Sequence, residues 1–534
     1  MSSVTIKIKH NGKLYEDVVV DLNSNGRVFK HRLHELTGVE PDKVKVVVKG
    51  GMLKDDADMT KLGFKQGQTV MVIGPAGPLP QAPTKPILFM EDMSDQQLAQ
   101  AVKTPVGLQN LGNTCYMNST VQVLRAIPEL QDALNSANLT RNGQPGTSLT
   151  TSLRDLYSNM SKTSEGFPPL IFLQMLRQFA PQFAEMSRSG GGYAQQDAQE
   201  AWASIIQAVK TSLGEGGNQF VEQYMTGTLQ KTLKSDEAPD EPATTSTDTF
   251  LDIKCNIGPQ TNFMMSGIID SLTTTLEKTS PSLNRQAVYQ QESKINRLPS
   301  YLTINLIRFY WRREISKKTK IMRKVKFPFE LNVLELLSSE LKSKIGPVNE
   351  RFQLIDKERR ERAKIRMRTK VQQTEQPTIQ GPEATQLSPS DDPPEQMIVD
   401  QDDQNQDEET LRKKERQELQ DLLDDSLKND KGANVTGLYE LVGLVTHKGA
   451  SADGDESCFF RVRVRPDQDL RHYVGWCAAP SDSDQDLVNP DKQTWYKFDD
   501  DKVSTTTRDK ITALEGGGED HTAYILLYRS KQID

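Results

Sequence analysis

Apolar and polar residues alternate with a period of two over residues 4–10, and this pattern predicts a β-strand at the start of the chain. The Asn11-Gly12 pair that follows tolerates the positive φ angles of a two-residue hairpin turn. Apolar residues then recur at helical spacing, and Gly38 is placed to end that helix. The first 75 residues are therefore expected to form a separate unit, with return and further strands at residues 18–20, 44–48, 52–53 and 69–73.

Composition changes after this unit, and we interpret the change as a domain boundary. The stretch GPAGPLPQAPTKP, residues 74–86, is rich in proline and glycine, and proline-rich segments behave as semi-extended spacers. We interpret residues 76–103 as a linker and residues 104–530 as a second, larger domain.

A charged segment interrupts the second domain at about residues 341–435. Residues 357–370 are strongly basic, whereas residues 389–409 are acidic, contain prolines and lack an apolar period. Residues 409–423 again carry leucines at helical spacing. This pattern predicts two charged helical arms around a disordered loop. We favour a tolerated surface insertion over a partner-binding element.

Cys115 stands at the head of an apolar run with helical spacing, formed by Met117, Val121 and Leu124. A thiol in the first turn of a helix faces unpaired backbone N–H groups and the positive end of the helix dipole, and both favour the reactive thiolate. Asn110, five residues upstream, is close enough to donate its amide to an oxygen on a carbon that Cys115 has attacked. An ordinary buried cysteine fits the same spacing.

Two stretches far downstream favour the catalytic interpretation. RHYVGW contains His472 where strand-like alternation resumes, and TWYKFDDDKV contains Asp499 after an aromatic-rich strand signal. A cysteine near a helix start, followed far downstream by His and Asp, is the order expected of a papain-like thiol hydrolase.

Several separated stretches resemble motifs of the ubiquitin-specific protease family, in the family's order. GLQNLGNTCYMNS resembles the family's Cys box, and HYVGW with WYKFDDDKV resembles its His box. GGGYAQQDAQE, residues 190–200, resembles the QQDAxE motif. Residues 290–309 and 324–332 resemble the central strands, so the resemblance covers roughly residues 104–530.

The resemblance implies an α+β chain whose catalytic domain has a papain-like thumb, palm and fingers. The first unit resembles a ubiquitin-like β-grasp domain, and because it ends in Ile73-Gly74-Pro75 rather than a free Gly-Gly carboxylate, we expect it to dock rather than be conjugated. Many family members carry a zinc ribbon in the fingers. The chain has four cysteines, Cys115, Cys255, Cys458 and Cys477, and no two of them have CxxC spacing. We therefore expect no zinc ribbon, no bound metal and no cofactor.

The family pattern also implies catalytic roles. Cys115 would be the nucleophile, His472 the general acid and base, and Asp499 the carboxylate that orients the imidazole. Asn110 and the backbone N–H of Cys115 would hold the oxyanion, and losing one such donor costs ~3 kcal/mol of barrier. Asp500 is the adjacent alternative to Asp499, and the family pattern favours the first acid after the phenylalanine.

The identity of the base and the loops near the site also need comment. His447 follows an apolar strand pattern and competes with His472 as the base, but the family spacing favours His472. One residue departs from the family pattern, because Arg471 stands where a small residue usually precedes the catalytic histidine. Residues 190–192 are three glycines and are expected to form a mobile segment.

The QQDAxE motif is expected to contact substrate. Asp197 and Glu200 are three residues apart and would share one face of a helix, with Gln196 beside them. The resemblance implies that they contact ubiquitin, whose tail is basic. A solvated helix face is the alternative.

We therefore expect a deubiquitinase that hydrolyses isopeptide bonds at the ubiquitin C-terminus through a thioester. A ubiquitin-like domain beside a zinc-free catalytic domain is similar to the proteasome-associated members, which implies docking on the proteasome regulatory particle, in cytoplasm and nucleus. The alternative is a ubiquitin-binding proteasome regulator whose main role is non-catalytic. A thiol phosphatase is disfavoured, because Val121 stands where that chemistry needs an arginine.

Composition excludes two other classes of partner. The 66 basic and 73 acidic side chains give a net charge of −7, which argues against a nucleic-acid-binding surface. The first residues lack an apolar signal core and no run reaches the ~20 apolar residues of a membrane span, so we expect no membrane partner and reduced intracellular thiols.

Overall fold

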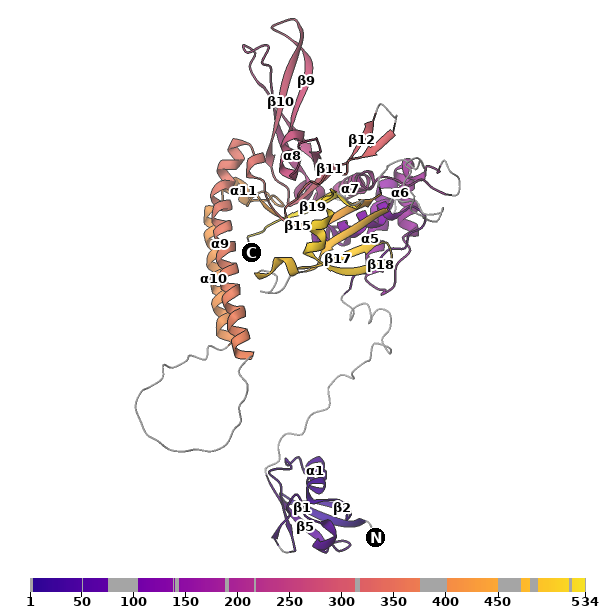
Figure 1. The fold of residues 1–534 in the computed structure, drawn as a ribbon, viewed down its shortest axis with the longest axis vertical. Helices are drawn as coiled ribbons and strands as arrows, with labels where there is room; N and C mark the ends of the chain where they lie inside the picture. Colours follow the sequence, from indigo (N-terminus) through magenta and orange to yellow (C-terminus); the bar gives the residue numbers. More distant parts are fainter. Residues whose placement is uncertain are drawn as a thin grey trace, which may run out of the picture. The chain divides into compact units, whose positions relative to one another are not determined.

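The computed structural model describes most of the chain, and these residues form two compact units, Met1–Asp92 and Met93–Asp534 (Figure 1). The described residues are 3–49, 51–74, 104–137, 139, 144–187, 192–215, 218–312, 317–374, 401–449, 472–480, 488–517 and 521–533. The predicted linker at residues 76–103 lies outside them, as do residues 389–400 of the predicted acidic loop. Residues 401–409 of that loop instead belong to a helix, contrary to the prediction.

The first unit is a five-stranded sheet covered on one face by a helix, which confirms the predicted β-grasp arrangement. Its strands follow the order β2-β1-β5-β3-β4, with β1 (Ser3–His10), β2 (Lys13–Asp21), β3 (Lys45–Val48), β4 (Gly51–Met52) and β5 (Thr69–Ile73). The helix is α1 (Gly26–Thr37), and a short 3-10 turn, η1, spans Met59–Leu62.

The hairpin turn and the helix end of this unit lie at the residues predicted from the sequence. Asn11 and Gly12 both have positive φ, 46° and 81°, in the hairpin between β1 and β2. Gly38 adopts the left-handed conformation at φ 72°, and its N–H bonds to the carbonyl of His34 at the end of α1. The core between sheet and helix is apolar and includes Ile6, Ile8, Phe29, Leu33, Val46 and Val70.

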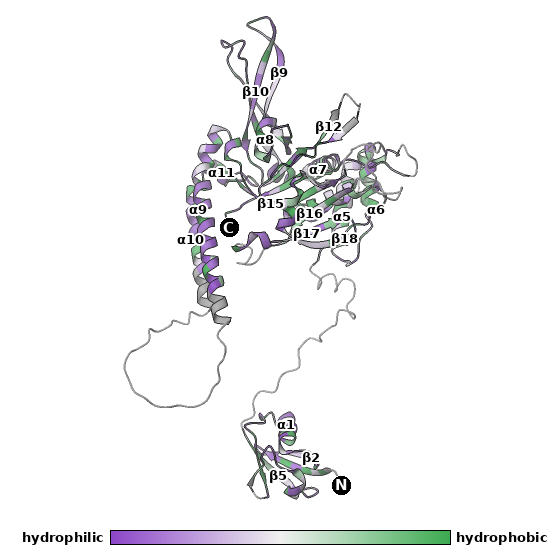
Figure 2. Cartoon of the chain, in the orientation of Figure 1, coloured by the Kyte–Doolittle hydropathy of each residue, from purple (hydrophilic) through white to green (hydrophobic). Residues whose placement is uncertain are grey.

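The second unit is built on an eight-stranded sheet. The main path is β18 (Lys502–Thr507), β17 (Thr494–Asp499), β16 (His472–Ala478), β15 (Leu438–Lys448), β19 (Thr522–Ser530), β11 (Tyr301–Ile307) and β8 (Asp252–Asn256). Strand β14 (Glu330–Asn332) pairs with β15 off this path. In Figure 2 the strands of this sheet carry many hydrophobic residues, as expected of a buried layer.

A group of helices packs on this sheet through a shared apolar core. They are α3 (Cys115–Arg125), α4 (Pro128–Ser136), α5 (Pro145–Met160), α6 (Leu170–Phe179) and α7 (Ala198–Glu215). Helix α3 is buried from Cys115 through Leu124, so it is the central helix of this layer rather than a surface helix. The shorter elements are η3 (Pro181–Ala184), η4 (Val221–Met225), η5 (Leu334–Leu336), η6 (Pro490–Lys492), α13 (Arg508–Thr512) and η7 (Ala513–Glu515).

A separate four-stranded sheet projects from the second unit beside β11 (Figure 1). Its order is β7 (Thr244–Phe250), β6 (Gly227–Lys234), β10 (Arg285–Arg297) and β9 (Thr273–Ser280), and α8 (Met264–Leu272) lies at its base. A two-stranded hairpin, β12 (Phe309–Arg312) and β13 (Lys317–Lys320), follows β11. The helical layer, the main sheet and this projecting four-stranded sheet together form the predicted thumb, palm and fingers. The projecting sheet is called the fingers sheet below.

In the described part of the chain, no group of three or more His, Cys, Asp or Glu side chains could hold a metal ion. Within those same ranges, the helices are all too short or too polar to cross a membrane.

The charged segment forms two long helices that lie side by side (Figure 1). They are α9 (Ser339–Thr374) and α10 (Gln401–Leu422), followed by the short α11 (Asp425–Lys428). A small apolar cluster that includes Phe352, Ile355 and Leu419 joins them. Ion pairs between the two helices flank this cluster. Three arginines of α9 bind Glu408 and Glu415 of α10, and they are Arg359, Arg362 and Arg366.

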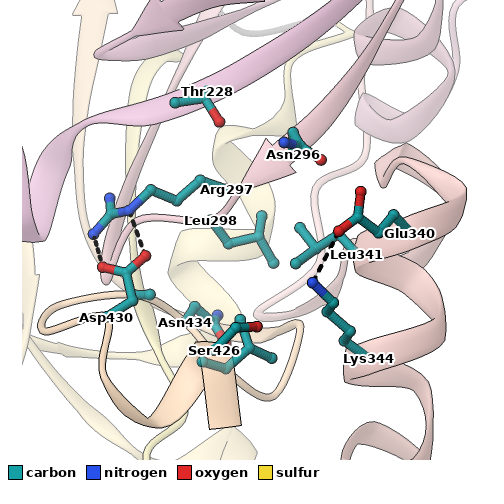
Figure 3. Close-up of a pocket in the computed structure, with 12 residues that line it drawn as sticks. Thr228, Asn296, Arg297, Leu298, Glu340, Leu341, Lys344, Ser426, Asp430 and Asn434 are labelled. Atoms are coloured by element: carbon teal, nitrogen blue, oxygen red, sulfur yellow. Dashed lines mark hydrogen bonds and ion pairs between the residues drawn. The ribbon is translucent and has the colours of Figure 1, made fainter. Parts of the chain in front are cut away.

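A cavity lies where this arm meets the fingers sheet (Figure 3). Its charged lining is internally paired, because Arg297 bonds to Asp430 at 2.6 Å and Lys344 bonds to Glu340 at 2.9 Å. Its lining includes none of the predicted catalytic or substrate-binding residues. We therefore interpret this cavity as part of the junction between arm and sheet.

Candidate active site

Cys115 is the first residue of α3, as predicted, and only 2% of it is exposed. The chain turns sharply before the helix, where Gly112 and Asn113 both have positive φ, 92° and 54°. The turn is held by its own polar groups, because Oδ1 of Asn110 accepts from the backbone N–H of Gly112 at 3.0 Å. This loop therefore delivers the thiol to the helix start, where backbone N–H groups lack helical partners.

Two glycines let α3 approach the central sheet closely. A Cβ added at Gly475 of β16 would lie 3.0 Å from the carbonyl oxygen of Ser119 in α3. A Cβ at Gly443 of β15 would lie 2.8 Å from a methyl of Val123. Because β16 begins at His472, this close packing fixes the strand of the histidine against the helix of the cysteine.

His472 and Asp499 form a short hydrogen bond, with 2.6 Å between Nε2 and Oδ1. The thiol of Cys115 is also hydrogen-bonded to His472. Since Asp499 occupies Nε2, the Nδ1 atom is the one left for the sulfur. The hydrogen bond of His472 to Asp499, followed by that to Cys115, raises the pKa of His472 to about 10, against the opposing effect of burial.

The structure separates the two candidate carboxylates. Asp500 Oδ2 lies 4.0 Å from Nε2 of His472, compared with 2.6 Å for Asp499 Oδ1. The hydrogen bond to His472, followed by that to Lys497, holds the pKa of Asp499 well below its usual range. Burial instead raises the pKa of Asp500. Asp499 is therefore the ionised carboxylate in contact with the imidazole.

Asp500 connects the histidine strand to the cysteine loop. Its two oxygens accept from Nδ2 of Asn110 at 2.9 Å and from Nδ2 of Asn118 at 2.8 Å. Its backbone carbonyl also accepts from the N–H of Leu108 at 3.0 Å. Asp500 has a φ of 56°, so the turn after β17 aims this side chain back at the cysteine loop. Asn110 is thus anchored by the acid that does not contact the imidazole.

Two further groups donate to the sulfur of Cys115. They are Nε2 of Gln195 at 3.3 Å and the backbone N–H of Tyr473 at 3.4 Å. Gln195 is not among the residues predicted from the sequence, although it lies in the same QQDAxE stretch as Gln196. The adjacent glutamines look alike in sequence, and only the path of the chain into α7 determines which one reaches the thiol.

The predicted substrate residues are arranged differently from the prediction. Asp197 precedes α7 and caps it, because its Oδ1 accepts from the N–H of Gln199 at 2.8 Å. The expectation that both residues lie within a helix is therefore met only by Glu200, because Asp197 is the residue that caps the helix start. The hydroxyl of Tyr524 donates to the carboxylate of Asp197 at 2.8 Å, while Glu200 is exposed and Gln196 is half-buried.

An aromatic cluster surrounds His447, the alternative base. Its ring packs edge-on against Phe309 and Tyr473, with centroids 5.2 and 4.8 Å apart. Tyr524 contacts Phe309 in turn, at 5.5 Å. His447 is 2% exposed and lies within this cluster, whereas His472 is the histidine bonded to both Asp499 and Cys115.

The other cysteines differ from Cys115. Burial raises the pKa of both Cys255 and Cys477 to about 12, so both stay protonated near neutral pH. Cys458 lies outside the described residues, as do Arg471 and the predicted mobile glycines Gly190 and Gly191.

Comparisons with known proteins place both units of the chain in known families. Residues 106–528 match the family model described as ubiquitin carboxyl-terminal hydrolase, and residues 4–75 match that of the ubiquitin family. The chain is 40% identical over 531 residues to ubiquitin carboxyl-terminal hydrolase 6 of Schizosaccharomyces pombe, covering 99% of each chain. It is 32% identical over 537 residues to ubiquitin carboxyl-terminal hydrolase 6 of Arabidopsis thaliana, again covering 99% of each.

A solved structure is also similar. It is that of a SAGA DUB module bound to ubiquitin aldehyde, with a TM-score of 0.46 and 17% identity over 80% of this chain and 70% of that chain.

Proposed function

Since the chain belongs to the ubiquitin carboxyl-terminal hydrolase family and is a deubiquitinase, we propose that it cleaves conjugates through Cys115 while docked on the proteasome. The observation that carries the proposal is the joint bonding of His472 to Asp499 and to Cys115, whose thiol heads a buried helix. A nucleophile, a base and an orienting carboxylate in this arrangement have the chemistry of acyl transfer.

The resting site is expected to hold a charged pair. The pKa of His472, about 10, means that its imidazole carries a proton near neutral pH. With Nε2 on Asp499, the Nδ1–H faces the sulfur of Cys115. Gln195 and the N–H of Tyr473 also donate to that sulfur, so three donors favour the thiolate as nucleophile.

Attack of the thiolate on the carbonyl of the terminal ubiquitin glycine produces a tetrahedral oxyanion. The amide of Asn110 and the backbone N–H of Cys115 are the donors proposed to hold it, and Asp500 keeps Asn110 in place. His472 then gives its proton to the leaving lysine amine, which releases the first product. Water, deprotonated by His472, hydrolyses the thioester and regenerates the thiolate.

Substrate recognition is proposed to involve the start of α7 and the aromatic cluster. Asp197 is fixed by Tyr524, and Glu200 is exposed one turn further along. Two carboxylates suit the arginines of a basic tail. Phe309, Tyr473 and Tyr524 form one ring cluster, in which Tyr524 binds Asp197 and the N–H of Tyr473 donates to the thiol. This cluster is proposed to border the path of the ubiquitin tail and to favour small residues there.

Docking is proposed to use the open face of the sheet in the first unit. This face exposes apolar side chains that the core does not need: Leu14, Val47, Met52, Met71 and Ile73, between 44% and 53% exposed. The register places Met71 between Val47 of β3 and Lys9 of β1, so the residues form one patch rimmed by lysines. We propose a subunit of the proteasome regulatory particle as its partner, which places the enzyme with the proteasome in cytoplasm and nucleus.

The test is hydrolysis of a ubiquitin–coumarin substrate by the full chain, with and without purified proteasomes. We expect slow hydrolysis alone, faster hydrolysis with proteasomes, and none from Cys115→Ala in either condition. Equal rates with and without proteasomes would reject activation by docking. Proteasome binding without any hydrolysis would instead favour the non-catalytic regulator.

A further inference from the structure

We propose that Lys497 is a positioning residue of the reaction, which fixes the carboxylate of Asp499 so that His472 is held in line with Cys115. The inference rests on the proposed roles of these three residues. It extends them by assigning a function to a lysine outside the predicted triad.

The geometry gives each oxygen of Asp499 its own partner. Oδ1 lies 2.6 Å from Nε2 of His472, and Oδ2 lies 2.8 Å from Nζ of Lys497. A carboxylate rotates readily about its terminal torsion, because that torsion has broad minima. A single contact to the imidazole would leave this rotation free, whereas the second contact restrains it.

The strand arrangement explains why the lysine reaches this oxygen. Lys497 and Asp499 are two residues apart on β17, so their side chains lie on the same face of the sheet. Lys497 also pairs with Trp476 across to β16, the strand that begins with His472. Its Nζ lies 5.7 Å from the centre of the Trp476 ring, within the range of a cation–π contact. Lys497 is therefore held against the strand of His472 while it bonds the carboxylate on its own strand.

The positive charge of Lys497 also favours the ionised form of Asp499. The hydrogen bond and charge of Lys497 help His472, the larger cause, to hold down the pKa of Asp499 against the opposing effect of burial. The other ionisable groups around this carboxylate are Cys115 and Asp500, which both act on His472, and His521 behind Trp476. Burial lowers the pKa of His521 to about 4, with help from Lys497, Lys320 and Lys448, so that ring is neutral.

An ordinary surface ion pair is the alternative. The side chains of Lys497 and Asp499 are 31% and 36% exposed, and exposed ion pairs contribute little to stability. A merely structural pair would therefore leave kcat unchanged. A positioning role predicts a kinetic effect much larger than any effect on folding.

The test compares full-length variants at Lys497 with a matched variant at Lys502. Lys502 lies opposite Asp499 in the pairing of β17 with β18, is exposed, and has no ion pair among the residues described. We expect Lys497→Met to lower kcat for ubiquitin–coumarin about 10-fold with little change in KM. The pH profile of kcat should stay close to that of the wild-type chain, because His472 is the larger cause of the low pKa of Asp499 and remains in place. Lys497→Arg should restore most of the rate, and Lys502→Met should match the wild-type chain.

Several results would overturn the inference. They are a wild-type kcat for Lys497→Met, an equal loss from Lys502→Met, or no rescue by Lys497→Arg at an unchanged melting temperature. Failure of the proposed function differs from failure of this inference. In the first case the wild-type chain itself would neither hydrolyse ubiquitin–coumarin nor react with ubiquitin vinyl sulfone.

Discussion

The side-chain amide of Asn110 donates to Oδ2 of Asp500 at 2.9 Å, although the two residues are 390 positions apart. The adjacent Asp499 bonds His472 instead. Two consecutive acids therefore serve two ends of one site, since one orients the imidazole and the other orients the amide proposed to hold the oxyanion.

This division predicts that Asp500 matters to the rate without touching His472. Asp500→Ala should lower kcat about 10-fold or more, because Asn110 loses its anchor and an oxyanion donor is worth about 100-fold or more. Alanine is also strained by roughly 1–2 kcal/mol at a φ of 56°. Asp500→Asn should lose less, since Asn tolerates this conformation and keeps one acceptor. Ubiquitin–coumarin kinetics measure both.

The control for this prediction is Asp501→Ala, which removes the exposed acid next in sequence. It should leave kcat unchanged. A wild-type kcat for Asp500→Ala would show that Asn110 needs no anchor.

The pH dependence follows from the pKa of His472. That pKa is raised to about 10, chiefly by Asp499, so the wild-type imidazole holds its proton up to alkaline pH. Asp499→Asn removes the main cause, and the pKa of His472 should fall toward its ordinary value of about 6.5. The alkaline limb of kcat/KM should then move to lower pH, and kcat near neutral pH should fall roughly 100-fold.

The measurement is a kcat/KM profile from acid to alkaline pH for the wild-type chain, Asp499→Asn and the control Asp501→Asn. An alkaline limb at the same pH in all three would contradict the assignment of Asp499 as the partner of His472.

The fold and the identity of the central residues could be predicted because they depend on local pattern and on motif order. Asn11-Gly12, Gly38 and the apolar run after Cys115 each act within a few residues, and the structure has the elements that they predict. These signals do not depend on how distant segments pack.

The finer contacts of the site could not be predicted, because they depend on register and on helix boundaries. Which glutamine reaches the thiol depends on where α7 begins, and Asp197 lies one residue before that start. Helix boundaries are the part of an element that a sequence pattern specifies least well. The contact of Lys497 likewise depends on the pairing of β17 with β16, which the sequence of one strand does not specify.

The docking patch predicts variants that separate binding from chemistry. Val47→Asp or Met71→Asp places a charge on the apolar face of the first unit and should weaken binding to purified regulatory particles at least 10-fold. Hydrolysis of ubiquitin–coumarin by the free chain should be unchanged. Equilibrium binding to immobilised particles measures the first effect.

Val28→Asp is the matched control, because Val28 is 56% exposed but lies on α1 rather than on the sheet face. Equal loss of binding from Val28→Asp would argue that charge or folding, and not this patch, determines docking.

The charged arm predicts a local loss of stability. Leu419 is 1% exposed in the small cluster between α9 and α10, so Leu419→Ala should destabilise their pairing by about 2–5 kcal/mol. Amide hydrogen exchange of α10 should become faster, while kcat stays unchanged. Leu422→Ala, at a residue 41% exposed, should have little effect on either measurement. Unchanged exchange in Leu419→Ala would show that the ion pairs alone hold the arm.

The most direct test of the central claim is peptide mass spectrometry of the full chain after reaction with ubiquitin vinyl sulfone. We predict a single ubiquitin adduct on Cys115, absent from Cys115→Ala and formed much more slowly by His472→Ala. An adduct on Cys255, Cys458 or Cys477, or adduct formation that does not depend on His472, would contradict the account.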